Sequence, residues 1–212
     1  MFVTFEGGEG AGKSSAIDFL HSKLVHQGFD VLVTREPGGT ALGQKIRKMV
    51  LDPFEQPLSK RAELLLFLAD RSQHVEEKIR PFLAKGGIVL CDRFIDSSLA
   101  YQSGVLPEDE LYAMNLFATG GLIPDRTYYL DMDPEVGLKR ITRDRGSTID
   151  RIESKELQFH REVRLNFLRL ALRYPSRIVK IDAEKPQQHV HHVILDNISQ
   201  YLYAANRPSN PS

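Results

Sequence analysis

The sequence predicts an α/β fold: a doubly wound five-stranded parallel sheet with helices on both faces. Five short apolar or β-branched runs alternate with helical patterns along almost the whole chain. A glycine-rich loop joins the first of these runs to the first helix, as in phosphate-binding α/β domains. No internal repeat or linker separates two cores. Residues 1–205 are therefore predicted to form one domain, with a lid at about 141–152 and a disordered tail at 206–212.

The predicted strands are short runs that end at charged or turn-forming residues. The run at 88–91 is continuously apolar, which is typical of a central strand in a parallel sheet. Because ligands bind beyond the carboxyl ends of such strands, the loops that follow them should carry the site. The five runs are 1–5, 31–34, 88–91, 127–131 and 177–182.

The helices are predicted from apolar residues at helical spacing and from capping residues. Thr40 is a good N-cap for a helix that reaches Val50. The longest helical stretch is 59–84, and Pro81 should kink or end it. Its segment Leu64–Leu68 is apolar on every side, which predicts burial all round. The remaining predicted helices follow the P-loop, cover 96–103 and 107–119, begin at Pro134, and cover 154–174 and 187–202.

The loop after the first strand fits the phosphate-binding P-loop motif G-x-x-x-x-G-K-[ST]. It lies between a strand and a helix with one apolar face, which is the context that the motif requires, so a chance glycine-rich turn is disfavoured. In this motif the Lys13 ammonium reaches the β- and γ-phosphates, and the Ser14 hydroxyl ligates Mg²⁺. The predicted triphosphate-binding residues are Gly7, Gly8, Glu9, Gly10, Ala11, Gly12, Lys13, Ser14 and Ser15.

The overall composition excludes several classes of protein. The 212 residues include 28 Lys and Arg and 28 Asp and Glu, a balance that argues against coating of nucleic acid or of an anionic membrane. The single cysteine, Cys91, excludes an internal disulfide framework, and its place in an apolar strand predicts a core residue. No leader pattern or membrane-length apolar run is visible, so a soluble cytoplasmic protein is expected.

Asp92 follows the apolar run 88–91, which is the position of a Walker B aspartate. A carboxylate there can hold Mg²⁺, directly or through water, opposite Ser14. The adjacent Arg93 could clamp a phosphate with its planar guanidinium. A helix N-cap or a loop ion pair is the alternative role for Asp92, and the P-loop favours the metal role.

Two other segments are candidates for binding a second substrate. The loop at 35–39, set by a proline and two glycines, presents Arg35 at the ligand edge, where it suits an acceptor phosphate. A solvated surface turn is the alternative. Phe67 and Arg71 lie four residues apart on one side of the long helix, so an aromatic face and a fork of donors could bind a flat base. Core packing is the alternative for Phe67.

The segment before the helix at 154–174 is strongly basic and contains Gly146. A basic loop that closes over a triphosphate would exclude water and supply charge in the transition state. A solvated charged face is the alternative. The basic residues are Arg140, Arg143, Arg145 and Arg151.

Three histidines near the C-terminus, His189, His191 and His192, suggest a metal cluster at first sight. Helical spacing places only the first and third on one face, and no cysteine or acidic residue lies at ligand spacing. A solvated helix face is therefore the favoured interpretation.

Taken together, these segments resemble the bacterial type of thymidylate kinase, from Phe2 to about Tyr201. The individual motifs are weak, but their shared order and spacing are highly specific. The matching pieces are Phe5-Glu6-Gly7 with the P-loop, residues 35–39, Leu65-Leu66-Phe67 with Ala69-Asp70-Arg71, Asp92-Arg93-Phe94, Ser97-Ser98 with Ala100-Tyr101-Gln102, Pro124-Asp125 with Leu130-Asp131, and Asp150-Arg151-Ile152-Glu153. At Phe94 the chain departs from the Tyr or His of many relatives.

The resemblance implies transfer of the γ-phosphoryl group of ATP to dTMP, with Mg²⁺ as cofactor, in a homodimer. It implies that Arg35 and Arg93 hold the dTMP phosphate and that Tyr101 lies under the sugar and disfavours a 2′-hydroxyl. A carboxylate in the phosphate cradle would repel ATP, so Glu9 should point away from it, and the resemblance implies that Glu9 faces the acceptor's sugar hydroxyl or the metal region. The implied thymine-binding residues are Phe67, which stacks on the base, and Arg71, Ser98 and Gln102, which contact its edge.

The resemblance also implies that the lid supplies the catalytic cation. Some relatives carry a basic residue within the P-loop, whereas positions 9–11 here are Glu, Gly and Ala. Arg145 and Arg151 are the leading candidates, and Arg143 is the third.

Three other functions compete with this one. A kinase for UMP, CMP or AMP is the nearest, and only the resemblance at residues such as Phe67 and Tyr101 disfavours it. A GTPase-like switch would need N-K-x-D and D-x-x-G strings, and neither occurs in the sequence. In a nucleoside kinase, whose acceptor carries no phosphate, Arg35 and Arg93 would have no anion to bind.

Overall fold

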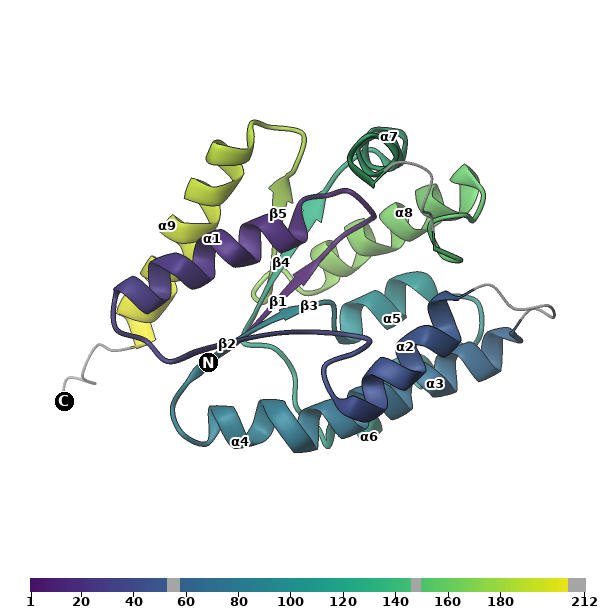
Figure 1. Cartoon of the computed structure of the whole chain (residues 1–212), viewed down its shortest axis with the longest axis horizontal. Coiled ribbons are helices and arrows are strands. Elements are labelled where there is room, and N and C mark those ends of the chain that lie inside the picture. Colours follow the sequence, from purple (N-terminus) through teal and green to yellow (C-terminus); the bar gives the residue numbers. More distant parts are fainter. Residues whose placement is uncertain (53–57, 146–149, 206–212) are drawn as a thin grey trace.

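All five strands lie in one parallel sheet, as predicted, with the order β2–β3–β1–β4–β5 (Figure 1). The computed structural model describes residues 1–52, 58–145 and 150–205, so the predicted tail at 206–212 and part of the predicted lid lie outside the described residues. The strands are β1 (Phe2–Glu6), β2 (Val31–Arg35), β3 (Ile88–Asp92), β4 (Arg126–Asp131) and β5 (Ile178–Asp182).

The two faces of the sheet are covered by different helices (Figure 1). Side chains alternate along each strand, so Val3 and Phe5 of β1 pack with α1 (Lys13–His26) and α9 (Gln187–Ala205). Phe2 faces the opposite way and packs on the π-helical turn η1 (Val75–Ile79). The rest of that face is covered by helices whose side chains form a further apolar cluster with Tyr129 and Ile178: α3 (Lys60–His74), α5 (Ile95–Tyr101), α6 (Glu108–Thr119) and α8 (Leu157–Arg173).

The predicted capping residue Thr40 is confirmed. Its Oγ1 accepts a hydrogen bond from Gly43 N at 2.9 Å and begins α2 (Ala41–Leu51). In the same way, Ser59 Oγ accepts from Ala62 N at 3.2 Å and begins α3. Both caps satisfy backbone donors that a helix cannot pair internally.

One of the two expectations for the long helical stretch was wrong. The segment Leu64–Leu68 is not buried all round: Leu64 and Leu68 are buried, but Leu65 is 56% exposed. The reason is that α3 packs between α2 and α6 and leaves one side uncovered. Pro81 was expected to kink or end the helix. The helical stretch continues past it to Leu83, but a π-helical turn interrupts the regular hydrogen-bond pattern just before it. The π-helical turn η1 precedes it and α4 (Arg80–Leu83) follows, so Pro81 falls in the first turn of a new ladder, where its missing N–H is tolerated.

The loops that follow β1 and β3 lie side by side. Phe5 is paired with Asp92 in the parallel register, and the chain leaves the two strands toward opposite faces of the sheet. This is the topological switch point at which open α/β sheets bind ligands. No helix within the described ranges has the length and hydropathy needed to cross a bilayer.

Candidate active site

A cleft of about 900 Å³ opens at the carboxyl ends of the strands. The P-loop, the loop after β2, α3, α5 and α7 (Pro134–Arg145) all contribute to its walls. The structure therefore brings together most of the site predicted from sequence. Among the predicted site residues whose side chains are described, all except Gly7, Gly8 and Arg151 line the cleft.

The P-loop wraps around the side chain of Lys13. Its Nζ atom donates hydrogen bonds to the backbone oxygens of Gly8 at 2.9 Å and Gly7 at 3.2 Å. Burial and the nearby Arg93 lower the pKa of Lys13. Triphosphate oxygens bound in the loop would be better partners for this ammonium than the two neutral carbonyls.

Asp92 has the properties of a metal-site carboxylate. Its Oδ1 atom is buried and has no hydrogen-bond partner among the described residues, although buried polar atoms are normally paired. The exposed Ser14 lines the same cleft. One carboxylate and one hydroxyl suit Mg²⁺, which keeps several waters and takes its other ligands from phosphates. The residues present therefore fit the predicted metal.

Glu9 lies at the centre of a group of three side chains. Its Oε1 accepts from Arg93 Nη2 at 2.6 Å and from the Tyr101 hydroxyl at 2.9 Å. Burial alone would raise the pKa of Glu9, but Arg93 and Lys13 lower it to about 2, so the group is a carboxylate at neutral pH. This carboxylate points at Arg93 and not into the phosphate cradle, as the electrostatic argument from sequence expected.

Arg93 occupies a sharp turn that buried Glu6 holds in place. Its φ of 70° lies in the left-handed region, which is uncommon for a residue with a side chain and is found where a site dictates it. Glu6 accepts from Phe94 N at 2.8 Å and from Ser97 Oγ at 2.5 Å. Burial and the neighbouring Asp96 raise the pKa of Glu6 to about 7. The sequence suggested no role for this carboxylate.

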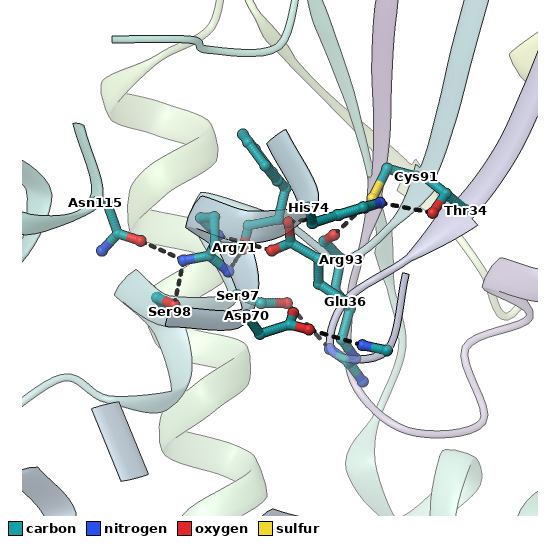
Figure 2. Close-up of polar contacts among 12 residues, drawn as sticks. Thr34, Glu36, Asp70, Arg71, His74, Cys91, Arg93, Ser97, Ser98 and Asn115 are labelled. Atoms are coloured by element: carbon teal, nitrogen blue, oxygen red, sulfur yellow. Dashed lines mark hydrogen bonds and ion pairs between the residues drawn. The ribbon is translucent and has the colours of Figure 1, made fainter. Parts of the chain in front are cut away.

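Arg71, a predicted base-binding residue, is only 2% exposed and is mostly used by the protein itself. Its Nε donates to Glu36, its Nη1 to Ser98 and Asn115, and its Nη2 to the Phe94 carbonyl (Figure 2). Since a guanidinium has five donors, one of its Nη2 hydrogens is left for a ligand in the cleft.

Arg35 and Arg47 form a cationic edge beside the loop after β2. The side chain of Arg35 is exposed and makes no hydrogen bond or ion pair with the described part of the chain. Arg47 donates to the Pro37 carbonyl at 3.0 Å, and burial followed by the nearby Arg35 lowers its pKa. Two neighbouring cations favour an anionic ligand between them. Arg47 was missed because it lies inside a helix and belongs to no motif.

Comparison with known proteins identifies the family. The family model for thymidylate kinase matches residues 5–194. The chain is 48% identical over 214 residues to the thymidylate kinase of Desulfovibrio desulfuricans, covering 98% of this chain and 99% of that protein. It is 42% identical over 212 residues to the thymidylate kinase of Oceanobacillus iheyensis, covering 99% and 94%. The chain belongs to the thymidylate kinase family.

A solved thymidylate kinase structure has the same fold. The enzyme from Ehrlichia chaffeensis superposes with a TM-score of 0.73 at 30% sequence identity, covering 93% of this chain and 98% of that one. The doubly wound sheet is therefore the fold of a solved thymidylate kinase.

The three lid arginines predicted from the resemblance have different surroundings. Arg143 lines the cleft. Arg151 points away from it: its Nε donates to the Val50 carbonyl at 2.8 Å, and its Nη2 is paired with Glu63. The side chain of Arg145, which ends α7, lies outside the described residues. Of the two lid arginines whose side chains the structure describes, Arg143 and Arg151, only Arg143 lines the cleft.

The histidine cluster is only partly a solvated face. His189 and His192 are exposed, as expected, but His191 lies against the start of α1. Its Nε2 is 3.1 Å from Ser15 Oγ, and its ring stacks on Phe19 with centroids 4.5 Å apart. His191 therefore lines the cleft beside the P-loop. The one sequence signal for this was its position on the inner face of the last helix.

The P-loop rests directly on the backbone of α7. A Cβ atom at Gly10 would lie 2.2 Å from the Gly137 carbonyl, and a Cβ at Gly137 would lie 2.2 Å from the Glu9 carbonyl. Such separations are far below van der Waals contact, so both positions require glycine. The sequence did not single out Gly137, because the contact joins segments more than a hundred residues apart.

Gly137→Ala is expected to weaken binding of Mg·ATP at least about tenfold, because the new methyl group must displace the P-loop backbone. Titration calorimetry would measure the affinity. Lys139→Ala, at an exposed position of the same helix, is the matched control and should bind Mg·ATP normally. An unchanged affinity in the folded Gly137→Ala protein would show that the contact is unimportant.

Proposed function

We propose that this chain transfers the γ-phosphoryl group of ATP to dTMP, giving dTDP and ADP in the synthesis of dTTP. The observation that carries the proposal is that the P-loop and two arginine-bearing loops open into one cleft. Lys13 marks the ATP end, and Arg35 and Arg93 mark the end for an acceptor that carries its own phosphate. Membership of the thymidylate kinase family supports dTMP as that acceptor.

In this proposal the protein positions two phosphates and neutralises their charge. An oxygen of the dTMP phosphate attacks the γ-phosphorus while the bond to the β,γ-bridging oxygen breaks and ADP leaves. The attacking oxygen is already ionised at neutral pH, since the second pKa of a phosphate monoester is about 6, so no general base is needed. Lys13 stabilises charge on the β- and γ-oxygens, and Arg93 holds the acceptor in line.

When bound, Mg²⁺ would neutralise the charge that develops on the phosphates. Ser14 and Asp92 are the residues proposed to hold it, and the unpaired Asp92 Oδ1 supports that assignment. For the nucleoside, Phe67 offers an aromatic face for thymine, and the predicted edge contacts are Arg71, Ser98 and Gln102. Gln102 Nε2 is 3.4 Å from Glu63 Oε1, so its amide oxygen is left for a ligand.

Tyr101 is proposed to select deoxyribose through the bulk of its ring. Tyr101→Phe loses the hydrogen bond to Glu9 but should keep the preference for dTMP over its ribo analogue. Tyr101→Ala removes the ring and should admit the ribo analogue. Comparison of kcat/KM for the two acceptors in both variants is the measurement. A selectivity ratio that stays constant in the alanine variant would rule out the steric explanation.

A panel of acceptors tests the proposed function. The protein is incubated with Mg·ATP and, separately, with dTMP, dUMP, UMP, CMP, AMP and thymidine, and ADP release is measured. We expect dTMP to give the highest kcat/KM and thymidine to give none, because the arginines would lack their anion. Faster turnover with another monophosphate would reassign the acceptor.

We also propose that the chain acts as a homodimer in the cytoplasm. The neighbouring helices α2, α3 and α6 each carry large exposed apolar side chains, which are Leu42, Met49, Leu65 and Phe117, the last 90% exposed. Apolar side chains gathered on adjacent helices are typical of a protein interface. A sedimentation mass of one chain, 24.1 kDa, at micromolar concentration would contradict the dimer.

A further inference from the structure

Helix α3 carries three buried polar side chains that face the loop after β2 (Figure 2). Asp70, Arg71 and His74 lie within about one turn of each other, and their exposed fractions are 2% or less. All three are hydrogen-bonded to the segment that links Arg35 to α2: Asp70 to the backbone of Gly38, and Arg71 and His74 to the side chain of Glu36. Buried charges are costly unless they serve a defined partner, so this cluster needs an explanation.

The Arg71 guanidinium ties together two segments that are distant in the sequence. Its Nε donates to Glu36 Oε2 at 2.7 Å, and its Nη2 donates to the Phe94 carbonyl at 2.9 Å. Glu36 directly follows Arg35, and Phe94 directly follows Arg93. One planar and rigid group therefore fixes the distance between the backbone segments that carry the two proposed phosphate-binding arginines.

His74 holds the other oxygen of Glu36. Its Nδ1 is 2.9 Å from Glu36 Oε1, and its Nε2 is 2.7 Å from Thr34 Oγ1. Because an ionised carboxylate only accepts hydrogen bonds, Nδ1 must donate to it. Each Glu36 oxygen thus has its own donor, and the carboxylate cannot turn away from Arg71 without leaving an oxygen unpaired.

The backbone of the same loop is seated on α3. Gly38 N donates to Asp70 Oδ1 at 3.0 Å. A Cβ atom at Gly39 would lie 2.4 Å from the His74 ring, so the loop and the ring are in direct contact there. The loop is therefore fixed through its backbone as well as through Glu36.

We propose that Glu36 and His74 are positioning residues that fix the loop of Arg35 relative to Arg93. The inference rests on the proposed function, in which these two arginines hold the phosphate of the acceptor. Arg71 keeps its contacts with Ser98 and the Phe94 carbonyl if Glu36 moves, so a disturbance should displace Arg35 rather than the base-binding end of Arg71.

Two substitutions of His74 separate the donor from the volume of the ring. In His74→Phe the ring volume remains but no donor faces Glu36. In His74→Asn the amide nitrogen can take the place of Nδ1 and donate. Titration calorimetry with dTMP and with thymidine measures the two affinities without any chemistry. We expect His74→Phe to weaken dTMP binding at least about tenfold and thymidine binding less than about twofold, with most of the dTMP affinity restored in His74→Asn.

Gln73→Ala is the matched control, because Gln73 lies on the exposed side of α3 and its side chain donates to Glu77 at the surface. Both affinities should match the wild type. Thermal unfolding reports whether each variant is folded. If His74→Phe does not fold, the same two affinities are measured for Thr34→Val. This variant keeps the shape of the side chain and removes the hydrogen-bond partner of His74 Nε2. A loss of about threefold or more for dTMP alone supports the proposal, and no loss overturns it.

Two results with folded His74→Phe would overturn the inference. Unchanged dTMP binding would mean that the buried network serves only stability. Equal losses for dTMP and thymidine would mean that it serves the base pocket and not the phosphate. Failure of the proposed function looks different, because the wild-type protein itself would then not bind dTMP more tightly than thymidine.

Discussion

Lys13→Ala is expected to lower kcat for phosphoryl transfer by about 10²-fold or more, because positioning and electrostatic stabilisation account for nearly all of this catalysis. The ammonium is buried in the P-loop, where it donates hydrogen bonds to the carbonyls of Gly7 and Gly8. A stopped assay of dTDP formation at saturating Mg·ATP measures the loss.

Asp92→Asn should give a loss of similar size through a different cause. The amide keeps the shape but removes the negative charge that we propose holds Mg²⁺, so added Mg²⁺ should restore part of the rate in this variant and none in Lys13→Ala. Lys23→Ala, at an exposed position of the same helix as Lys13, is the control and should be fully active. Near-normal turnover in Lys13→Ala or in Asp92→Asn would show that the role assigned to that residue is wrong.

Removal of the catalytic lid arginine is expected to lower kcat by about 10³-fold or more, the usual effect of an arginine that meets the transferred phosphoryl group. Arg143, which lines the cleft, is the first variant to test. Arg151 would first have to leave Glu63 and the Val50 carbonyl, and Arg145 completes the set. Because the contact strengthens in the transition state, kcat should fall more than ATP affinity does.

The matching lysine variants sharpen this test, since a point charge replaces a planar fork only in part. Arg161→Ala, an exposed arginine paired with Glu135 on the surface, is the control and should keep full activity. If Arg143, Arg145 and Arg151 can each be replaced by alanine with less than about a tenfold drop in kcat, the lid does not supply the cation. Arg93 would then be the next candidate.

The parts of the fold that could be predicted from sequence are those set by local chemistry. The P-loop lies where its strand and helix require it, and Thr40 caps α2 through a bond to Gly43, three residues away. The apolar run that ends at Asp92 forms the interior strand β3, between β2 and β1. Each of these features depends on residues within a few positions, so a pattern in the chain is enough to find it.

The parts that could not be predicted depend on contacts between distant segments. Gly137 needs its lack of a side chain only because the P-loop rests on it. Glu6 stabilises the turn at Arg93 through its hydrogen bond with Phe94 N. The left-handed backbone of that turn could not be predicted, because an arginine does not favour this conformation. Leu65 is exposed although its neighbours are apolar, because helix packing and not sequence decides which side of α3 is covered.

Transfer of radiolabel tests the central claim most directly. The protein is incubated with Mg²⁺, dTMP and ATP labelled with ³²P at the γ-position, and the products are separated by chromatography. The account predicts that the label leaves ATP and appears in dTDP, in its β-phosphate, in equal amount to the ADP formed. Release of the label as inorganic phosphate, with dTMP unchanged, would contradict it.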